Sequence, residues 1–281
     1  MQRRLPRSSM RQSRASYKRF ACFVEFLGNF TEQAKSDFRG HSPGAALDKQ
    51  LKRKEIKGGN MAGAKTIVCF GDSNTHGYNN KNGKRFSEHV RWPMVLQELL
   101  GEEYLVREEG LSGRTTVFED PLYEGLSGVS MIRPILLTHE PVSLVIIMLG
   151  TNDVKERFSA TAENISRGLE RLIRKAQSVQ EAFTEEKPKI LIIAPYPIDP
   201  EYKDTIVGNE MGKDCCEKSK AIIPLYEEVA KRTGCAYLSA QDIPGVENYP
   251  YDYMHLSPEA HKALAEHLAQ WIPDYFSEEG K

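Results

Sequence analysis

The stretch TIVCFGDSNT, residues 66–75, joins a short apolar run directly to a small polar turn. Its first five residues contain no charge, as in a strand that is buried on both faces of a sheet. The glycine and aspartate that follow favour a turn. The stretch therefore predicts a central strand whose carboxyl end presents polar side chains.

Apolar runs recur along the chain after this strand, at residues 104–106, 143–149, 189–194 and 235–238. Stretches with the apolar spacing of helices lie between and after them, at residues 90–100, 129–138, 161–182, 214–233 and 257–271. Strands that alternate with helices favour a parallel sheet that is covered on both faces. We predict an α/β protein with three α/β/α layers and about five parallel strands.

In open parallel sheets, functional groups gather outside the carboxyl ends of the strands. Four polar segments are expected at that edge, residues 71–75, 110–114, 150–153 and 252–255. Together they supply a serine hydroxyl, backbone amides beside glycines, a carboxamide and an Asp/His pair. This set of groups is suited to acyl transfer.

Each of these groups has a role in that chemistry. A serine hydroxyl needs a base to take its proton, and His255 is the candidate base for Ser73. Asp252, three residues before the histidine, would hold its tautomer and stabilise its positive charge. The backbone amides of Ser73 and Gly113 and the side-chain amide of Asn152 would donate hydrogen bonds to the oxyanion.

Taken singly, each segment also has a purely structural explanation. A Gly-Asp-Ser turn is most often only a turn, an asparagine after a strand often caps a loop, and an Asp-x-x-His pair also occurs in Asx-turns. Their occurrence in order at predicted strand ends favours the catalytic interpretation. Two neighbouring acids have structural assignments: we expect Asp72 to support the turn and Asp153 to accept hydrogen bonds from loop amides.

These segments resemble the sequence blocks of the SGNH, or GDSL-type, hydrolase superfamily. Its serine, glycine and asparagine match Ser73 in GDSN, Gly113 in LSGRT and Asn152 in GTND. Its Asp and His match Asp252 and His255 in DYMH. The stretches VCFGDSNTHGY, VRWPMVLQELLG, EEGLSGRTT and LVIIMLGTND are similar to its bacterial arylesterase/acyltransferase branch, and the similarity covers roughly residues 64–275.

The resemblance implies a flavodoxin-like sheet and a serine esterase that hydrolyses short-chain, acetyl-type esters through an acyl-serine, without a metal or cofactor. It also implies a homo-oligomer, and some members of the branch transfer the acyl group to alcohols. A carbohydrate deacetylase, or a non-catalytic carbohydrate-binding protein on the same scaffold, is the alternative. One departure is Asn74, where the motif that gives the family its name has leucine.

Substrate contacts are expected beside these segments. We predict that Asn74, Trp92 and Tyr253 line the substrate pocket, although the helical spacing of Trp92 also suits a core residue. Three long connections lie at the same edge, residues 76–90, 116–128 and 197–213. Long loops at such an edge usually shape the choice of substrate.

Other functional classes lack support in the sequence. No run approaches the ~18 apolar residues that span a bilayer, and there is neither a phosphate-binding glycine motif nor a G-x-S-x-G elbow. His255, His261 and His267 recur every six residues, which does not align them on one helical face, so no metal site is expected. The five cysteines are too few and too irregularly spaced for a disulfide scaffold, which favours a reducing, cytoplasmic location.

Charge divides the chain near residue 60. Residues 1–60 contain 14 Lys/Arg and 5 Asp/Glu, whereas residues 61–281 contain 24 and 34, which together give the net charge of −1. An organellar transit segment or a natural tail would explain this basic leader. We favour a third interpretation, upstream sequence read from a misassigned start, because codons for Lys-Gly-Gly just before Met61 can form a ribosome-binding tract. The enzyme domain is then residues 61–281, with no nucleic-acid or membrane partner implied.

Overall fold

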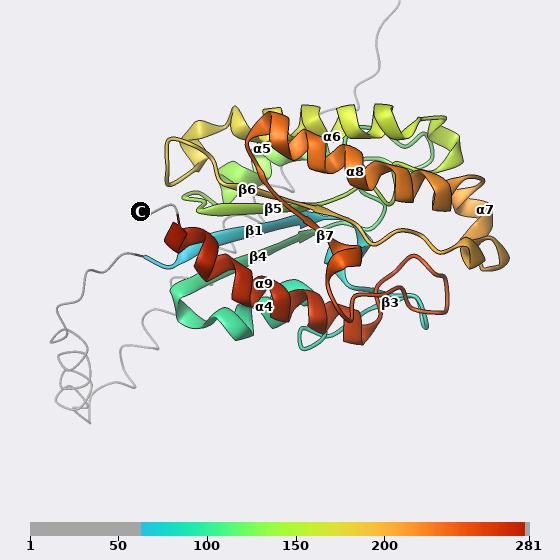
Figure 1. The fold of residues 1–281 in the computed structure, drawn as a ribbon, viewed down its shortest axis with the longest axis horizontal. Coiled ribbons are helices and arrows are strands. Elements are labelled where there is room, and N and C mark those ends of the chain that lie inside the picture. Colours follow the sequence, from blue (N-terminus) through green and yellow to red (C-terminus); the bar gives the residue numbers. More distant parts are fainter. Residues whose placement is uncertain (1–62, 279–281) are drawn as a thin grey trace, which may run out of the picture. The chain divides into compact units, whose positions relative to one another are not determined.

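In the computed structural model, which describes residues 63–278, a five-stranded parallel sheet forms the centre of the protein (Figure 1). Its strands are β1 (Lys65–Gly71), β4 (Tyr104–Gly110), β5 (Leu144–Met148), β6 (Ile190–Ala194) and β7 (Ala236–Ser239). They lie in the order β4-β1-β5-β6-β7, with every neighbouring pair parallel. This is the flavodoxin-like order, which confirms the predicted fold. The predicted leader, residues 1–60, lies outside the described residues.

Helices cover both faces of the sheet (Figure 1). One face packs against α4 (Trp92–Leu100) and α9 (Pro258–Glu278), and the other against α5 (Gly128–Thr138), α6 (Ala162–Gln177) and α8 (Cys215–Thr233). The connections contain two helical turns, α3 (Ser73–His76) and α7 (Gly208–Met211), and the hairpin of β2 (Tyr78–Asn79) and β3 (Lys84–Arg85). They also contain 3₁₀ turns at Gly101–Glu103, Glu156–Phe158, Gln180–Ala182, Pro200–Asp204 and Ala240–Asp242. Within residues 63–278, no helix has the length and apolarity needed to cross a membrane.

The central strands are apolar on both faces because each face borders a separate hydrophobic layer. In β1, Ile67 and Cys69 pack into the layer that contains α4 and α9. Val68 and Phe70 pack into the layer beneath α5, α6 and α8. Full burial of one such side chain stabilises the fold by about 1.5–3 kcal/mol, so the uninterrupted apolar run of β1 contributes to both layers, as do the runs of β5 and β6.

Several boundaries differ from the sequence-based expectation. The helix predicted over 161–182 ends at Gln177, and a 3₁₀ turn follows it. The last helix continues beyond the predicted end at residue 271, to Glu278, with Pro273 inside it. The second strand extends to Gly110, through polar residues that periodicity alone does not assign to a strand. Ser257 caps the start of the last helix, since its Oγ accepts a hydrogen bond from Ala260 N at 3.0 Å.

A close approach of backbone segments places α3 across the ends of β1 and β4. Gly71 and Gly110 are paired in the sheet register. A Cβ on Gly110 would lie 2.1 Å from His76 N, and a Cβ on Gly71 would lie 2.0 Å from Thr75 Oγ1. The absence of side chains at these two glycines therefore allows the helical turn that begins at Ser73 to rest directly on the strand ends.

We predict that Gly110→Ala lowers the free energy of unfolding by about 1–3 kcal/mol or more, because the added methyl group meets backbone that has no room to move. Denaturant unfolding measures this change. Gly63→Ala is the control, since nothing lies within 4 Å of its Cβ position. Equal stability of Gly110→Ala and the wild-type protein would show that α3 does not depend on this approach.

Candidate active site

Ser73 lies at the first position of α3, immediately after the end of β1. Asp72 caps this turn, because its Oδ1 accepts a hydrogen bond from Asn74 N at 2.9 Å. The expectation that Asp72 supports the turn is thus confirmed. The serine is 4% exposed and lines a cavity of about 910 Å³, so its hydroxyl is held in place and still faces open space.

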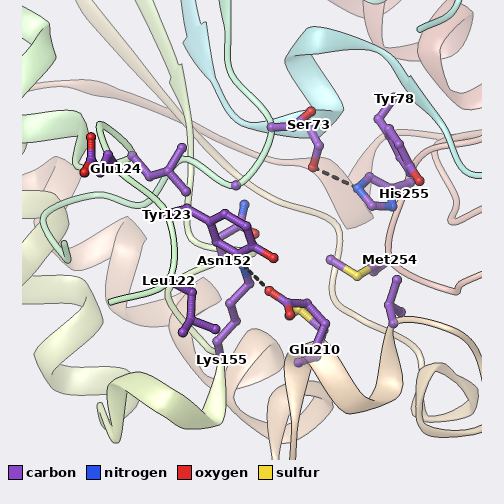
Figure 2. A pocket seen from close by; sticks show the side chains of 15 residues that line it. Ser73, Tyr78, Leu122, Tyr123, Glu124, Asn152, Lys155, Glu210, Met254 and His255 are labelled. Carbon is purple, nitrogen blue, oxygen red and sulfur yellow. Dashed lines mark hydrogen bonds and ion pairs between the residues drawn. The ribbon is translucent and has the colours of Figure 1, made fainter. Parts of the chain in front are cut away.

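His255 and Asp252 complete a chain of hydrogen bonds to this serine, and Figure 2 shows the bond between His255 and Ser73. His255 Nε2 lies 2.8 Å from Ser73 Oγ, and His255 Nδ1 lies 2.6 Å from Asp252 Oδ2. The other carboxylate oxygen, Oδ1, accepts from the backbone N–H groups of Met254 and His255 at 3.2 and 3.1 Å. One aspartate therefore orients both the imidazole ring and the loop that bears it.

The hydrogen-bond network determines the histidine tautomer. An ionised carboxylate only accepts hydrogen bonds, so Nδ1 donates to Asp252 and Nε2 is left to accept from the Ser73 hydroxyl. Burial alone would raise the pKa of Asp252, but its hydrogen bond with His255 and the attraction to that ring hold the pKa below its ordinary value. This arrangement can take a proton from the serine while it attacks an electrophile.

Gly113 and Asn152 line the same cavity as Ser73. Gly113 has φ of +86°, a left-handed conformation that favours glycine. Asn152 Nδ2 donates to Arg114 O at 3.2 Å, which orients the amide beside the glycine. The structure thus brings together all five residues that the sequence nominated for acyl transfer, although they come from four separate segments.

All three long connections contribute side chains to the cavity, as expected from their position (Figure 2). Tyr78 comes from the first connection and Tyr123 from the second. Val207, Glu210 and Met211 come from the third. The walls of the cavity are therefore made largely by loops and short turns, while Ser73, Gly113 and Asn152 line it from the segments that follow the strands.

None of the three predicted pocket residues lines the cavity, so the prediction is wrong for Asn74, Trp92 and Tyr253. Trp92 is fully buried in the layer between the sheet, α4 and α9, and it does not line the cavity because the apolar face of α4 packs onto the sheet. Tyr253 has φ of +60° and packs against the opposite hydrophobic layer. The unusual backbone at Tyr253 lies between Asp252 and His255, and Tyr253 is absent from the cavity lining.

Asn74, the third predicted pocket residue, is buried and fastens the histidine loop to α3. Its Nδ2 donates to Met254 O at 3.3 Å, and its Oδ1 accepts from Leu256 N at 2.9 Å. The two bonds lie on either side of His255 in the sequence. A leucine, the residue that the resembling family has at this position, could make neither bond, so the departure replaces apolar packing with a polar clamp.

Sequence reasoning missed Tyr78, whose ring packs against the imidazole. The ring centroids of Tyr78 and His255 are 4.8 Å apart, with 52° between the planes. Tyr78 also lines the cavity beside Ser73. The available signal was its position in the stretch GDSNTHGY, five residues after Ser73. A residue so close to the serine in the chain is well placed to contact the histidine that bonds that serine.

A buried acid supports the loop that bears the glycine and arginine. Asp153 Oδ1 accepts from Thr116 N at 2.9 Å and also from the Thr116 hydroxyl, as expected for an acid that bonds loop amides. Burial raises the pKa of Asp153 to about 6, and the pKa of Asp72 is raised to about 6 for the same reason. Within residues 63–278, no three metal-ligating side chains gather into a set that could hold an ion.

Comparison with known proteins relates the chain to esterases. The model of the GDSL-like lipase/acylhydrolase family matches residues 69–263. An acetylxylan esterase from Xylanibacter ruminicola is 28% identical over an alignment of 224 residues, which covers 73% of this chain and 42% of that esterase. The chain thus spans less than half the length of this curated relative.

Three solved structures share both fold and sequence with the chain. The carbohydrate acetylesterase Est24 from Sinorhizobium meliloti is 32% identical with a TM-score of 0.67, over 75% of this chain and 99% of that one. The M. smegmatis aryl esterase is 31% identical with a TM-score of 0.67, over the same shares. A putative arylesterase from Agrobacterium tumefaciens is 34% identical with a TM-score of 0.67, again over 75% and 99%.

We predict that Asn74→Ala loosens the histidine loop. Each buried backbone group that loses its partner costs about 1–3 kcal/mol, so the variant should unfold at a lower temperature and the Leu256 amide should exchange its hydrogen faster. Amide exchange and thermal unfolding measure both effects.

Two further variants serve as controls. Asn74→Leu keeps the size of the side chain but loses its hydrogen bonds, so it should show the same lower unfolding temperature and faster exchange. Asn164→Ala, on the exposed side of α6, should change neither the unfolding temperature nor the exchange of the Leu256 amide. Unaltered exchange at Leu256 in Asn74→Leu would contradict the clamp.

We predict that Asp153→Asn flattens the pH dependence of stability. The folded pKa of about 6 exceeds the ordinary 3.8, so between these pH values the folded protein holds a proton that the unfolded chain has released. The free energy of unfolding of the wild-type protein therefore falls as pH rises from about 4 to 6, by up to about 3 kcal/mol for this group. Asparagine cannot ionise, and its oxygen still accepts from Thr116. Parallel curves of stability against pH for the two proteins would contradict this prediction.

Proposed function

The chain belongs to the GDSL-like lipase/acylhydrolase family, and we propose that it is a serine esterase that hydrolyses short-chain carboxylic esters. The observation that supports this most directly is the chain of hydrogen bonds from Ser73 through His255 to Asp252, at the edge of an open cavity. In this proposal Ser73 is the nucleophile, His255 is the general base, and Asp252 holds the imidazole and stabilises its charged form.

In the acylation step, Ser73 Oγ forms a bond to the ester carbonyl carbon while its proton passes to His255 Nε2. The carbonyl oxygen becomes an oxyanion, which receives hydrogen bonds from the backbone N–H groups of Ser73 and Gly113 and from Asn152 Nδ2. When the tetrahedral intermediate collapses, the bond to the alcohol oxygen breaks. His255 gives its proton to that oxygen, so a neutral alcohol leaves and the acyl group remains on Ser73.

Deacylation reverses these roles with water as the nucleophile. His255 takes a proton from the water, the new carbon–oxygen bond forms, and the bond to Ser73 Oγ breaks as the serine regains its proton. A second alcohol in place of water would give acyl transfer by the same steps. Each step uses the hydrogen-bonded side chains of Ser73, His255 and Asp252 together with the proposed oxyanion donors.

We propose acetyl-type esters as substrates, with acetylated carbohydrates as the second candidate. The related structures include an aryl esterase and a carbohydrate acetylesterase, and the curated relative is an acetylxylan esterase. A protein that only binds carbohydrate has no use for a serine whose hydroxyl is hydrogen-bonded to an oriented histidine, so the geometry disfavours the non-catalytic alternative.

We also propose an oligomeric state, a cellular location and the extent of the enzyme domain. A homo-oligomer follows from the resemblance to the arylesterase branch. A cytoplasmic location agrees with the four cysteines that the structure describes, which are all free thiols and of which Cys69, Cys215 and Cys216 are buried. We propose that residues 61–281 form the enzyme and act on small esters.

Ser73→Ala should reduce the turnover of p-nitrophenyl acetate by about 10³-fold or more, because the nucleophile is lost while the fold is kept. Assays at matched protein concentration measure the turnover of p-nitrophenyl acetate by the variant and the wild-type protein. Thermal unfolding checks that the variant is folded. Ser112→Ala removes a second serine that lines the same cavity and should retain most of the activity. A folded wild-type protein without turnover of any short ester would refute the proposed function.

Asn152→Ala should lower kcat about 10²–10³-fold and leave a measurable residue of activity, because two backbone donors remain to bind the oxyanion. The same assay, with active-site titration to count competent molecules, distinguishes slow turnover from misfolding. If Asn152→Ala were as stable as the wild-type protein but as inactive as Ser73→Ala, the Asn152 side chain would have a role beyond being one of three hydrogen-bond donors to the oxyanion.

A further inference from the structure

Four charged side chains form one cluster of ion pairs, and two of them, Lys155 and Glu210, line the cavity across from Ser73 (Figure 2). Lys155 Nζ lies 3.5 Å from Glu210 Oε1 and 3.9 Å from Asp120 Oδ2. Arg157 contacts the same two carboxylates, at 2.6 Å from Glu210 and 3.3 Å from Asp120. This charged quartet joins the second and third long connections to the loop that follows Asn152, and its two positive and two negative charges cancel.

The quartet is built into the protein and open to the cavity on one side. The side chains of Lys155 and Asp120 are 6% and 0% exposed, which only paired charges tolerate. The Glu210 side chain is 40% exposed, and both Glu210 and Lys155 line the cavity. A molecule in the cavity therefore meets an ammonium group that donates hydrogen bonds and a carboxylate that accepts them, side by side.

Apolar surface surrounds these two polar groups. Leu122, Val207 and Met211 line the cavity with them, and the Tyr123 side chain extends toward Glu210 and Lys155 (Figure 2). A long alkyl chain would leave the ammonium and the carboxylate without solvation and is disfavoured there. An acetyl group occupies only a small part of about 910 Å³, so the alcohol part of a short ester fills most of this space.

We propose that Lys155 and Glu210, with the ring of Tyr123, form a subsite for the hydroxyl groups of a neutral polyhydroxylated alcohol, which is the sugar part of an acylated carbohydrate. The inference rests on the proposed esterase function. A hydroxyl both donates and accepts, so neighbouring hydroxyls satisfy the carboxylate and the ammonium together, and the apolar walls pack on the C–H faces of the ring. The cancelled charges of the quartet favour neutral alcohols over charged ones.

The test compares two acetates of similar size, the mono-O-acetates of methyl β-xylopyranoside and cyclohexyl acetate, which lacks the free hydroxyls. We expect the wild-type protein to prefer the sugar ester by kcat/KM. In Glu210→Gln, the ratio of kcat/KM for the sugar ester to that for cyclohexyl acetate should fall about tenfold or more, because a charged acceptor of hydroxyl hydrogen bonds is lost. Glu124→Gln, a glutamate at the same cavity but outside the quartet, should leave the ratio unchanged.

Failure of this subsite is distinguishable from failure of the esterase proposal. A wild-type protein that hydrolyses p-nitrophenyl acetate but shows no preference for the sugar ester would overturn the subsite alone. So would a parallel loss on both acetates in Glu210→Gln, which would assign the quartet a purely structural role. A wild-type protein that prefers an aryl acetate bearing a carboxylate over the sugar ester would also overturn the proposed subsite, since Lys155 would then bind an anion. Lack of all ester turnover would refute the proposed function itself.

Discussion

The close contact between α3 and the ends of β1 and β4 is the constraint on which the rest of the site depends. Gly110 leaves the space that the backbone of Thr75 and His76 occupies, and Gly71 leaves the space of the Thr75 side chain, so the helical turn rests directly on the sheet. Ser73 begins this turn, and its hydroxyl is thereby aimed into the cavity rather than into the core. A looser connection would leave the serine on a mobile loop, without a defined distance to any base.

From this anchored turn, hydrogen bonds extend to the opposite end of the sequence. Asn74 holds the two backbone groups on either side of His255, while Ser73 itself bonds the imidazole. Asp252 then bonds both the ring and the loop backbone. The geometry of the triad is therefore supported from two directions, and the buried acids Asp72 and Asp153, although costly to ionise, secure the turn and the neighbouring loop through backbone hydrogen bonds.

The sequence predicted the fold and the five residues of the proposed catalytic centre because both follow local rules. Apolar runs on both faces indicate buried parallel strands, and the topology of such a sheet brings their ends together. Pocket residues depend on how loops fold back over that edge, which no local pattern encodes. Trp92 was assigned to the pocket although its helical spacing also suited the core position that it occupies. Lys155 and Glu210 were missed because they lie 55 positions apart in the sequence and meet only in the folded protein.

The bond between Ser73 and His255 spans 182 positions of the sequence. During synthesis, the serine leaves the ribosome early, together with β1, while its base is still to be translated. Contacts of such high sequence separation form late in folding, because the entropy of closing the intervening chain must first be overcome. The proposed catalytic centre is therefore complete only after the segment before α9, which is translated late, has docked onto the sheet.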